Sequence, residues 1–81
     1  MRLLFSAKAL RDYQNSPERV RQAADKQFSF LLKNLKHSSL RAQKYDETKD
    51  VWQARITRNW RFYFQIREDT YHIITIIRHP Q

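Results

Sequence analysis

The apolar positions in the first half of the chain have the spacing of helices. Met1 to Phe5 forms a short apolar segment, which we interpret as a strand, and Ser6 is a residue type that caps the start of a helix. After the Ser16-Pro17 break, apolar residues recur in steps of three and four from Val20 to Leu35. This stripe predicts a long helix from Pro17 to about Leu35, with Ser16 as its cap and one face against a core.

In the second half, apolar and polar residues alternate, as they do in half-buried strands. The alternation runs from Val51 to Thr57 and resumes from Trp60 to Arg67. A third segment, Tyr71 to Arg78, is apolar on both faces at its centre, which is typical of a central strand. Leu40 to Tyr45 is interpreted as a further short strand or an extended arm.

The connections between these strands are predicted from the faces that must be buried. If Ile56 and Phe62 face the same side, the connection holds an odd number of residues, which Arg58-Asn59-Trp60 supplies. Asn59 is expected in the left-handed conformation, since the chain has no glycine. Glu68-Asp69 is expected to form the next turn.

The order of elements predicts an α+β fold. We expect an N-terminal strand and two helices packed on one face of a three- to four-stranded, mainly antiparallel sheet. The 81 residues form one domain, 1–81, because dividing the chain would leave each half too little core.

The sheet face turned away from the helices is expected to be basic. Arg55, Arg61, Tyr63, Gln65 and Arg67 alternate with the apolar positions. Two interpretations stay open: a solvated outer face of a basic protein, or a groove that binds anions.

Composition indicates a folded protein with a polyanionic partner. The chain has 16 Lys+Arg against 8 Asp+Glu, a net charge of +8, and 41% hydrophobic residues. RNA, DNA, an acidic protein or an anionic membrane surface fits this charge. The longest apolar stretch, Ile73 to Ile77, is too short to cross a bilayer, so we expect a soluble, cytoplasmic protein and no membrane partner.

Missing residue types exclude several kinds of site. Without cysteine there are no disulfides, thiolate nucleophiles or cysteine zinc sites, and without glycine there is no glycine-rich phosphate loop. We therefore expect no cofactor and no metal; Asp46, Glu47 and Asp50 are interpreted as a solvated hairpin. His72 and His79 lie seven residues apart, on opposite faces of a regular strand, so no two-histidine ribonuclease pair is expected.

Motifs in the second half resemble those of a toxin family. The chain contains Lys44-Tyr45, Val51-Trp52-Gln53-Ala54-Arg55-Ile56, Asn59-Trp60-Arg61-Phe62-Tyr63-Phe64 and Ile76-Ile77-Arg78-His79. After a strand and two helices, this pattern resembles the RelE/ParE superfamily of bacterial toxin–antitoxin pairs. The resemblance implies a microbial-ribonuclease-like sheet that either cuts messenger RNA inside the ribosome or inhibits DNA gyrase. It also implies an acidic antitoxin as partner.

The resemblance also implies roles for individual residues. Arg61 and Arg55 match two family arginines, and permanent cations there would stabilise the extra negative charge on a phosphate during cleavage. His79 falls where the family has a functional Arg or His, and imidazole suits acid or base chemistry near neutral pH. The expected RNA-binding residues are Lys44, Arg41, Tyr63, Arg58 and Arg78.

Two features depart from the RelE pattern. RelE-type chains commonly carry a catalytic tyrosine after this position, whereas Pro80-Gln81 follows His79. Three alternatives stay open: Tyr63 substitutes, the activity is slower, or the target differs. With a two-residue turn at Glu68-Asp69, Arg61 would pair with Ile76 and His79 would face the helices, unless a longer turn or a bulge intervenes.

Three hypotheses follow from these features. The leading one is a metal-independent endoribonuclease toxin that acts on messenger RNA in the ribosome. The second is a gyrase inhibitor with no catalytic residues, and the third is a non-catalytic basic module that binds RNA or protein.

Overall fold

The computed structural model describes residues 1–79 and has helices and strands in nearly the predicted order. The helices are α1 (Ala7–Gln14) and α2 (Glu18–Lys33), followed by the short 3-10 helix η1 (Ser38–Leu40). Within the described residues, neither α-helix is long and apolar enough to cross a membrane. The strands are β1 (Arg2–Phe5), β2 (Gln43–Asp46), β3 (Val51–Thr57), β4 (Trp60–Arg67) and β5 (Thr70–Arg78).

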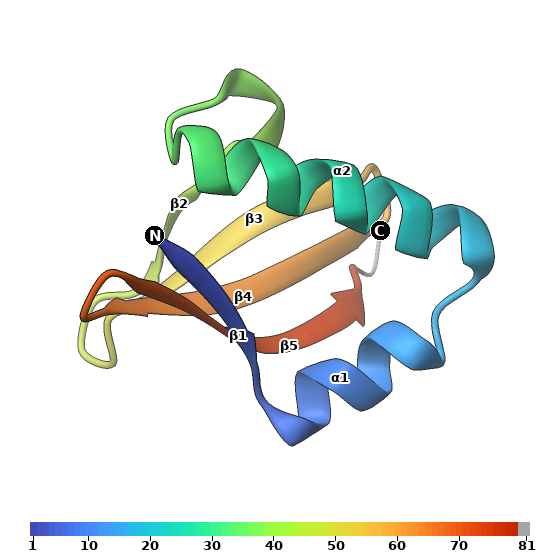
Figure 1. Cartoon of the computed structure of the whole chain (residues 1–81), viewed down its shortest axis with the longest axis horizontal. Helices are drawn as coiled ribbons and strands as arrows, with labels where there is room; N and C mark the ends of the chain where they lie inside the picture. The colour runs from blue at the N-terminus through green and yellow to red at the C-terminus, as the bar shows by residue number, and fades with distance from the viewer. Residues whose placement is uncertain (80–81) are drawn as a thin grey trace.

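The strands form one mixed sheet in the order β1-β5-β4-β3-β2. β1 runs parallel to β5, and the other neighbours are antiparallel. The α+β fold with two helices is confirmed, but the predicted three to four strands are too few, because β1 and β2 both join the sheet as its edges. α2 packs against β3, while α1 packs against β5 and β1 (Figure 1).

The core lies between α2 and the central strands. Phe28 and Leu31 of α2 face Phe62 and Phe64 of β4, and the Phe28 and Phe62 rings meet edge to face with centroids 5.0 Å apart. Phe62 and Phe64 are fully buried, so the apolar side of the predicted alternation is the core side.

One helix cap is confirmed and one is wrong. Ser6 Oγ accepts a hydrogen bond from Ala9 N at 2.9 Å and caps α1. The Ser16 hydroxyl instead donates to the Asp12 carbonyl at 2.7 Å, and α2 begins at Glu18 with Pro17 as its N-cap. The turn from Tyr13 to Ser16, closed by the hydrogen bond from Ser16 N to the Tyr13 carbonyl, places the Ser16 hydroxyl beside the Asp12 carbonyl. That carbonyl lies in the last turn of α1 and has no partner within the helix.

The predicted connection between β3 and β4 is wrong. Ala54 pairs with Phe62 and Arg55 with Arg61, and a bulge at Ile56 precedes the Thr57–Trp60 pair, so only two residues lie between the strands. The odd residue that was predicted for the connection lies instead within β3, as the bulge at Ile56. Ala54 and Ile56 are both buried, as expected. The expectation of a left-handed Asn59 is also wrong, since the residues with positive φ angles are Arg41, Asp50, Glu68 and Asp69.

The two-residue turn at Glu68-Asp69 is confirmed, with both φ angles positive. Of the alternatives left open for the next pairing, the bulge is the one present: Ile74 has no partner between the Phe64–Ile73 and Tyr63–Thr75 pairs, so the Arg61–Ile76 pairing of a regular ladder does not form. Arg61 consequently pairs with Ile77. Alternation then places His79 on the Arg61 face and not on the helix-covered face.

Candidate functional site

Two arginines face each other across the open side of the sheet. Arg55 of β3 and Arg61 of β4 are direct cross-strand partners, and like charges in this position destabilise a sheet. Neither arginine makes an ion pair within residues 1–79, where the ion pairs involve only Lys8 and Lys44. The pair is therefore an anion-binding candidate, and we call it the arginine pair.

The Arg61 guanidinium is held in place by the β3–β4 turn. Its Nη1 donates to the carbonyl oxygens of Thr57 at 2.7 Å and of Arg58 and Trp60 at 3.1 Å. Burial, and then the positive charges of Arg55 and Arg41, lower the pKa of Arg61. A guanidinium has five hydrogen-bond donors, so this anchoring through Nη1 leaves Nη2 and Nε to meet an anion.

A third arginine, Arg41, lies near the pair, and the segment that carries it is held there by Gln27, a residue that the sequence did not single out as part of the site. Arg41 follows η1 with φ 48° and ψ 41°, and it shares a hollow of about 550 Å³ with Arg55. The buried Gln27 of α2 donates from Nε2 to the Arg55 carbonyl at 2.8 Å and to the Ser39 carbonyl at 3.1 Å. Gln27 thus ties η1 to β3. A glutamine on the apolar stripe of a helix is the sequence signal that points to it.

His79 lies at the turn end of the same face. Its backbone N–H donates to the Asn59 carbonyl, so the β4–β5 ladder continues one residue past β5, and its side chain is exposed. The expectation that His72 and His79 lie on opposite faces is wrong, because the Ile74 bulge adds one residue between them. They are still roughly 20 Å apart along the strand, so they form no catalytic pair.

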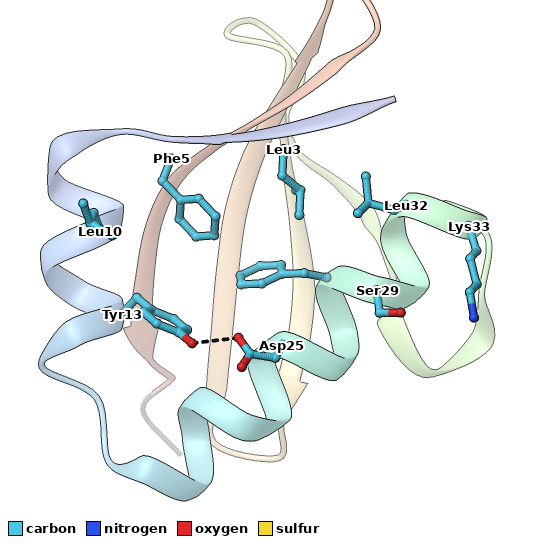
Figure 2. Close-up of a pocket in the computed structure, with 9 residues that line it drawn as sticks. Leu3, Phe5, Leu10, Tyr13, Asp25, Ser29, Leu32 and Lys33 are labelled. Atoms are coloured by element: carbon cyan, nitrogen blue, oxygen red, sulfur yellow. Dashed lines mark hydrogen bonds between the residues drawn. The ribbon is translucent and has the colours of Figure 1, made fainter.

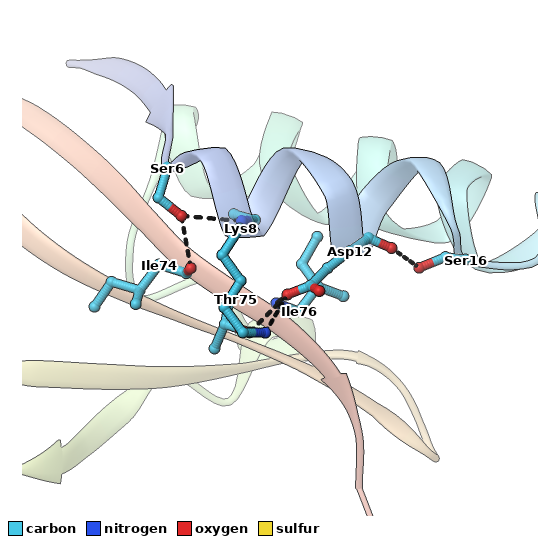
Figure 3. A network of polar contacts seen from close by, with 8 residues as sticks. Ser6, Lys8, Asp12, Ser16, Ile74, Thr75 and Ile76 are labelled. Atoms are coloured by element: carbon cyan, nitrogen blue, oxygen red, sulfur yellow. Dashed lines mark hydrogen bonds and ion pairs between the residues drawn. The ribbon is translucent and has the colours of Figure 1, made fainter.

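Polar side chains of α1 and of its N-cap hold the bulge that turns His79 to this face. Ser6 Oγ donates to the Ile74 carbonyl at 2.7 Å, and Asp12 Oδ2 accepts from Thr75 Oγ1 at 2.7 Å and from Ile76 N at 3.1 Å (Figure 3). Lys8 Nζ lies 2.9 Å from the same carboxylate. Burial raises the pKa of Asp12, but the hydrogen bonds from Thr75, Lys8 and Ile76 outweigh burial and lower it overall.

Tyr63 lies at the centre of the open face, two residues from Arg61 on β4. Its ring is 9% exposed and meets the Tyr45 ring edge to face with centroids 4.9 Å apart. Burial, and then Tyr45, raise the pKa of Tyr63, although Arg61 opposes the shift. The Tyr63 hydroxyl is therefore neutral at ordinary pH.

The structure separates two of the other predicted RNA-binding residues, Lys44 and Arg78, from the arginine pair. Lys44 pairs with Trp52 on the helix-covered side, where its Nζ lies 5.3 Å from the ring centroid and 2.5 Å from an Asp50 carboxylate oxygen. Arg78 pairs with Trp60 and alternates to the face opposite Ile77. Arg58 is exposed in the β3–β4 turn, at the end of the site.

The arginine pair has no acidic neighbour on its own strands. Strands β3, β4 and β5 contain no Asp or Glu, and the acids lie in the helices, in the turns and at the end of the edge strand β2. Lys44 lies 3.8 Å from Glu47 and also pairs with Asp50, which accounts for two of the three hairpin acids. Within residues 1–79, no three His, Cys, Asp or Glu side chains group as metal ligands would.

A separate apolar groove lies on the helix side. It has a volume of about 650 Å³ between β1, α1 and α2, and Figure 2 shows the side chains that line it. Leu10 and Leu32 on its walls are 47% and 43% exposed, and the Tyr13 hydroxyl donates to Asp25 Oδ1 at 2.8 Å across it. The apolar lining comprises Leu3, Phe5, Leu10, Tyr13, Phe28 and Leu32.

Comparison with solved structures identifies this arrangement of elements. No protein-family model and no curated protein matches the chain. The YoeB/ParE toxin from Agrobacterium tumefaciens superposes with a TM-score of 0.82 at 16% identity, covering 99% of this chain and 100% of that chain. The chain has the fold of the YoeB and RelE toxins.

Further structures agree with this YoeB/RelE fold. The YoeB dimer from Staphylococcus aureus gives a TM-score of 0.81 at 15% identity, covering 99% of this chain and 98% of that chain. The isolated E. coli RelE toxin gives 0.79 at 17% identity, covering 98% of this chain and 84% of that chain. The fold implied by the sequence resemblance is thereby confirmed.

Proposed function

We propose that this protein is the toxin of a type II toxin–antitoxin pair and that it cleaves messenger RNA in the ribosome. The observation that carries the proposal is the arginine pair: two cations opposite each other on an open sheet face, with no acid on their strands. A pair of this kind is destabilising unless an anion binds between or beside the guanidinium groups. The YoeB/RelE fold supports an RNA phosphate as that anion.

The proposed cleavage is a transesterification that needs no metal. The 2′-hydroxyl of the RNA attacks the adjacent phosphorus, the bond to the 5′-oxygen breaks, and a cyclic phosphate forms. Arg55 and Arg61 stabilise the negative charge that accumulates on the phosphate oxygens. The 2′-hydroxyl loses one proton and the leaving 5′-oxygen gains one. His79 makes one of these transfers, as the base for the 2′-hydroxyl or as the acid for the 5′-oxygen, and solvent water makes the other.

Expression in growing bacteria, followed by mapping of messenger RNA 5′ ends, tests this proposal. We expect new ends inside translated codons and their loss in Arg61→Ala. Arg67→Ala is the matched control, because Arg67 is exposed on the same strand and the same face, far from the β3–β4 turn. Growth arrest with intact messages would overturn the cleavage proposal.

Gyrase inhibition is the second candidate. It is favoured because, near the arginine pair, His79 is the side chain best suited to proton transfer, His72 lying roughly 20 Å away along the strand. It is also favoured by a similar structure that carries the ParE name. A supercoiling assay with purified gyrase and this protein decides the matter. Unaffected supercoiling removes this candidate, and expression without any effect on growth would favour a non-catalytic basic module.

An acidic antitoxin is the proposed protein partner. Similar structures include the RelB–RelE complex from Methanococcus jannaschii and a YoeB–YefM complex from Staphylococcus aureus. The net charge of +8 favours an acidic partner. Co-expression with the product of the neighbouring reading frame is expected to restore growth; an unchanged growth arrest with every neighbouring product would contradict the pairing.

A further inference from the structure

A second hollow lies on the open face beside the arginine pair. It has a volume of about 320 Å³. Its apolar and aromatic lining comprises Tyr45, Val51, Tyr63, Ile74 and Ile77, and its polar lining comprises Asp46, Lys49 and Thr75. Ile77 is the direct cross-strand partner of Arg61, so the hollow and the arginine pair share a row of the sheet. The hollow is mostly apolar, although it lies on the face that carries the cations.

Two of the lining residues are large apolar groups left open. Tyr45 is 64% exposed and Ile77 is 39% exposed. Ile74 is the bulged residue of β5, so the same distortion that turns His79 toward Arg61 also adds an extra side chain to this part of the strand. Exposed aromatic and aliphatic groups around a hollow are a feature of ligand sites.

The shape and neighbourhood of the hollow fit a nucleobase. A base has apolar faces, and protein sheets hold unpaired RNA by stacking bases on aromatic side chains. Tyr63 stands two residues from Arg61 on β4, about 7 Å along the strand. A base against the tyrosines would therefore lie within reach of a phosphate held by Arg61.

We propose that Tyr45, Tyr63, Ile74 and Ile77 form a subsite that stacks one unpaired nucleobase of the RNA whose adjacent phosphate binds the arginine pair. The inference rests on the proposed function, which supplies the RNA. It assigns Tyr45 a role that its sequence position did not suggest, and it makes Tyr63 a wall of the base site, because the Tyr63 ring is largely buried in the sheet face.

Binding of a fluorescein-labelled nine-nucleotide single-stranded RNA, measured by anisotropy, tests the subsite. The second probe is the same RNA with its inner bases removed and its phosphates kept. We expect Tyr45→Ala to weaken binding of the intact RNA about tenfold, since base stacking contributes about 1–3 kcal/mol. Tyr45→Ala should leave the affinity for the base-free RNA unchanged, and Tyr45→Phe should bind both probes like the wild type.

Arg55→Ala separates the subsite from the proposed function. It should weaken binding of both probes and reduce the salt slope by roughly 0.7 for one lost phosphate contact, whereas Tyr45→Ala should leave the slope unchanged. Ile77→Ser is a second variant in the hollow, and thermal unfolding verifies that each variant is folded.

Equal loss on intact and base-free RNA, or no loss in both Tyr45→Ala and Ile77→Ser, overturns the base subsite. If Arg55→Ala still weakens binding in that case, the phosphate site of the proposed function stands without the subsite. If neither Arg55→Ala nor Tyr45→Ala changes RNA binding, both proposals fail, and a protein becomes the better occupant of the hollow.

Discussion

At the scale of single residues, Arg61 combines a structural and a proposed chemical role. Its Nη1 binds three carbonyl oxygens of the β3–β4 turn, and the guanidinium also stands opposite Arg55. The turn therefore fixes the position of the cation before any anion arrives. This arrangement reduces the side-chain entropy that would be lost on binding.

Substitution of Arg61 separates the two roles. We expect Arg61→Ala to lower RNA cleavage about a hundredfold or more, as loss of a transition-state donor does, while the free energy of unfolding falls by about 1 kcal/mol through the lost turn contacts. Arg61→Lys keeps the charge without the planar fork and should restore only part of the cleavage. Cleavage rates and urea unfolding measure the two effects. An Arg61→Ala variant that cleaves like the wild type would contradict the assignment.

At Arg41, the effect of the backbone on stability can be separated from the effect of the side-chain charge on RNA binding, because the backbone is left-handed. Arg41→Gly should raise the free energy of unfolding relative to Arg41→Ala by about 1 kcal/mol, since glycine adopts this conformation without steric cost. Both variants should weaken RNA binding equally, because both lack the cation. Denaturant unfolding and anisotropy check these outcomes; a glycine variant with wild-type RNA binding would remove Arg41 from the site.

At the scale of elements, the alternation of residues predicted which strand faces are buried, and the bulges decided how those faces align. The basic face with Arg55, Arg61 and Tyr63 follows from the period of two. The bulges at Ile56 and Ile74 do not follow from it. The Ile74 bulge is held by Ser6 and Asp12 of the α1 region, more than 60 residues away in the chain, a contact that local pattern does not encode.

Lys44 is a second case in which the local sequence pattern did not predict the face of a residue. Its position beside the basic motifs suggested a place with the arginines, but its pairing with Trp52 puts it on the other side of the sheet, where Asp50 and Glu47 neutralise it. The face of a residue on a four-residue edge strand with an internal bulge depends on register, which tertiary packing sets.

The α1–β5 network predicts a pH dependence of stability. The pKa of Asp12 lies below its ordinary value of 3.8, so the stabilisation is present above that value and is lost as the pH falls through the lower, folded-state pKa. Asp12→Asn should cost about 1.5 kcal/mol at pH 7, the order of a hydrogen bond to a charged group, and this difference should vanish at the acid end. Urea unfolding from pH 7 to pH 2 measures it, with Glu47→Gln, whose side chain is 81% exposed, as control. A difference between wild type and Asp12→Asn that does not change with pH would contradict the role of the charge.

The β4–β5 turn predicts a stabilising substitution. Glu68 and Asp69 both have positive φ, a conformation that costs residues with a side chain roughly 1–2 kcal/mol each. Glu68→Asn combined with Asp69→Gly should raise the free energy of unfolding by about 1 kcal/mol, because Asn-Gly is preferred in such hairpins. Chemical denaturation measures the change, and a less stable double variant would contradict the turn geometry.

At the scale of the whole molecule, charge and shape divide the protein into two sides. The open sheet face carries the arginine pair and the tyrosine-lined hollow, whereas the helix side carries the apolar groove. The absence of glycine means that any phosphate is held by side chains and not by a glycine-rich backbone loop. A net charge of +8 adds a long-range attraction for RNA that salt should weaken.

In vitro translation with the purified protein, followed by mapping of messenger RNA ends, tests the central claim most directly. Ribosome-free RNA is the parallel reaction, and the variants are Arg61→Ala, His79→Ala and the control Arg67→Ala. We expect cuts within translated codons that require ribosomes, disappear in Arg61→Ala, weaken strongly in His79→Ala and persist in Arg67→Ala. Messages that stay intact with the wild-type protein would contradict the claim that the protein cleaves RNA. Cuts that persist in Arg61→Ala would contradict the claim that cleavage depends on the arginine pair.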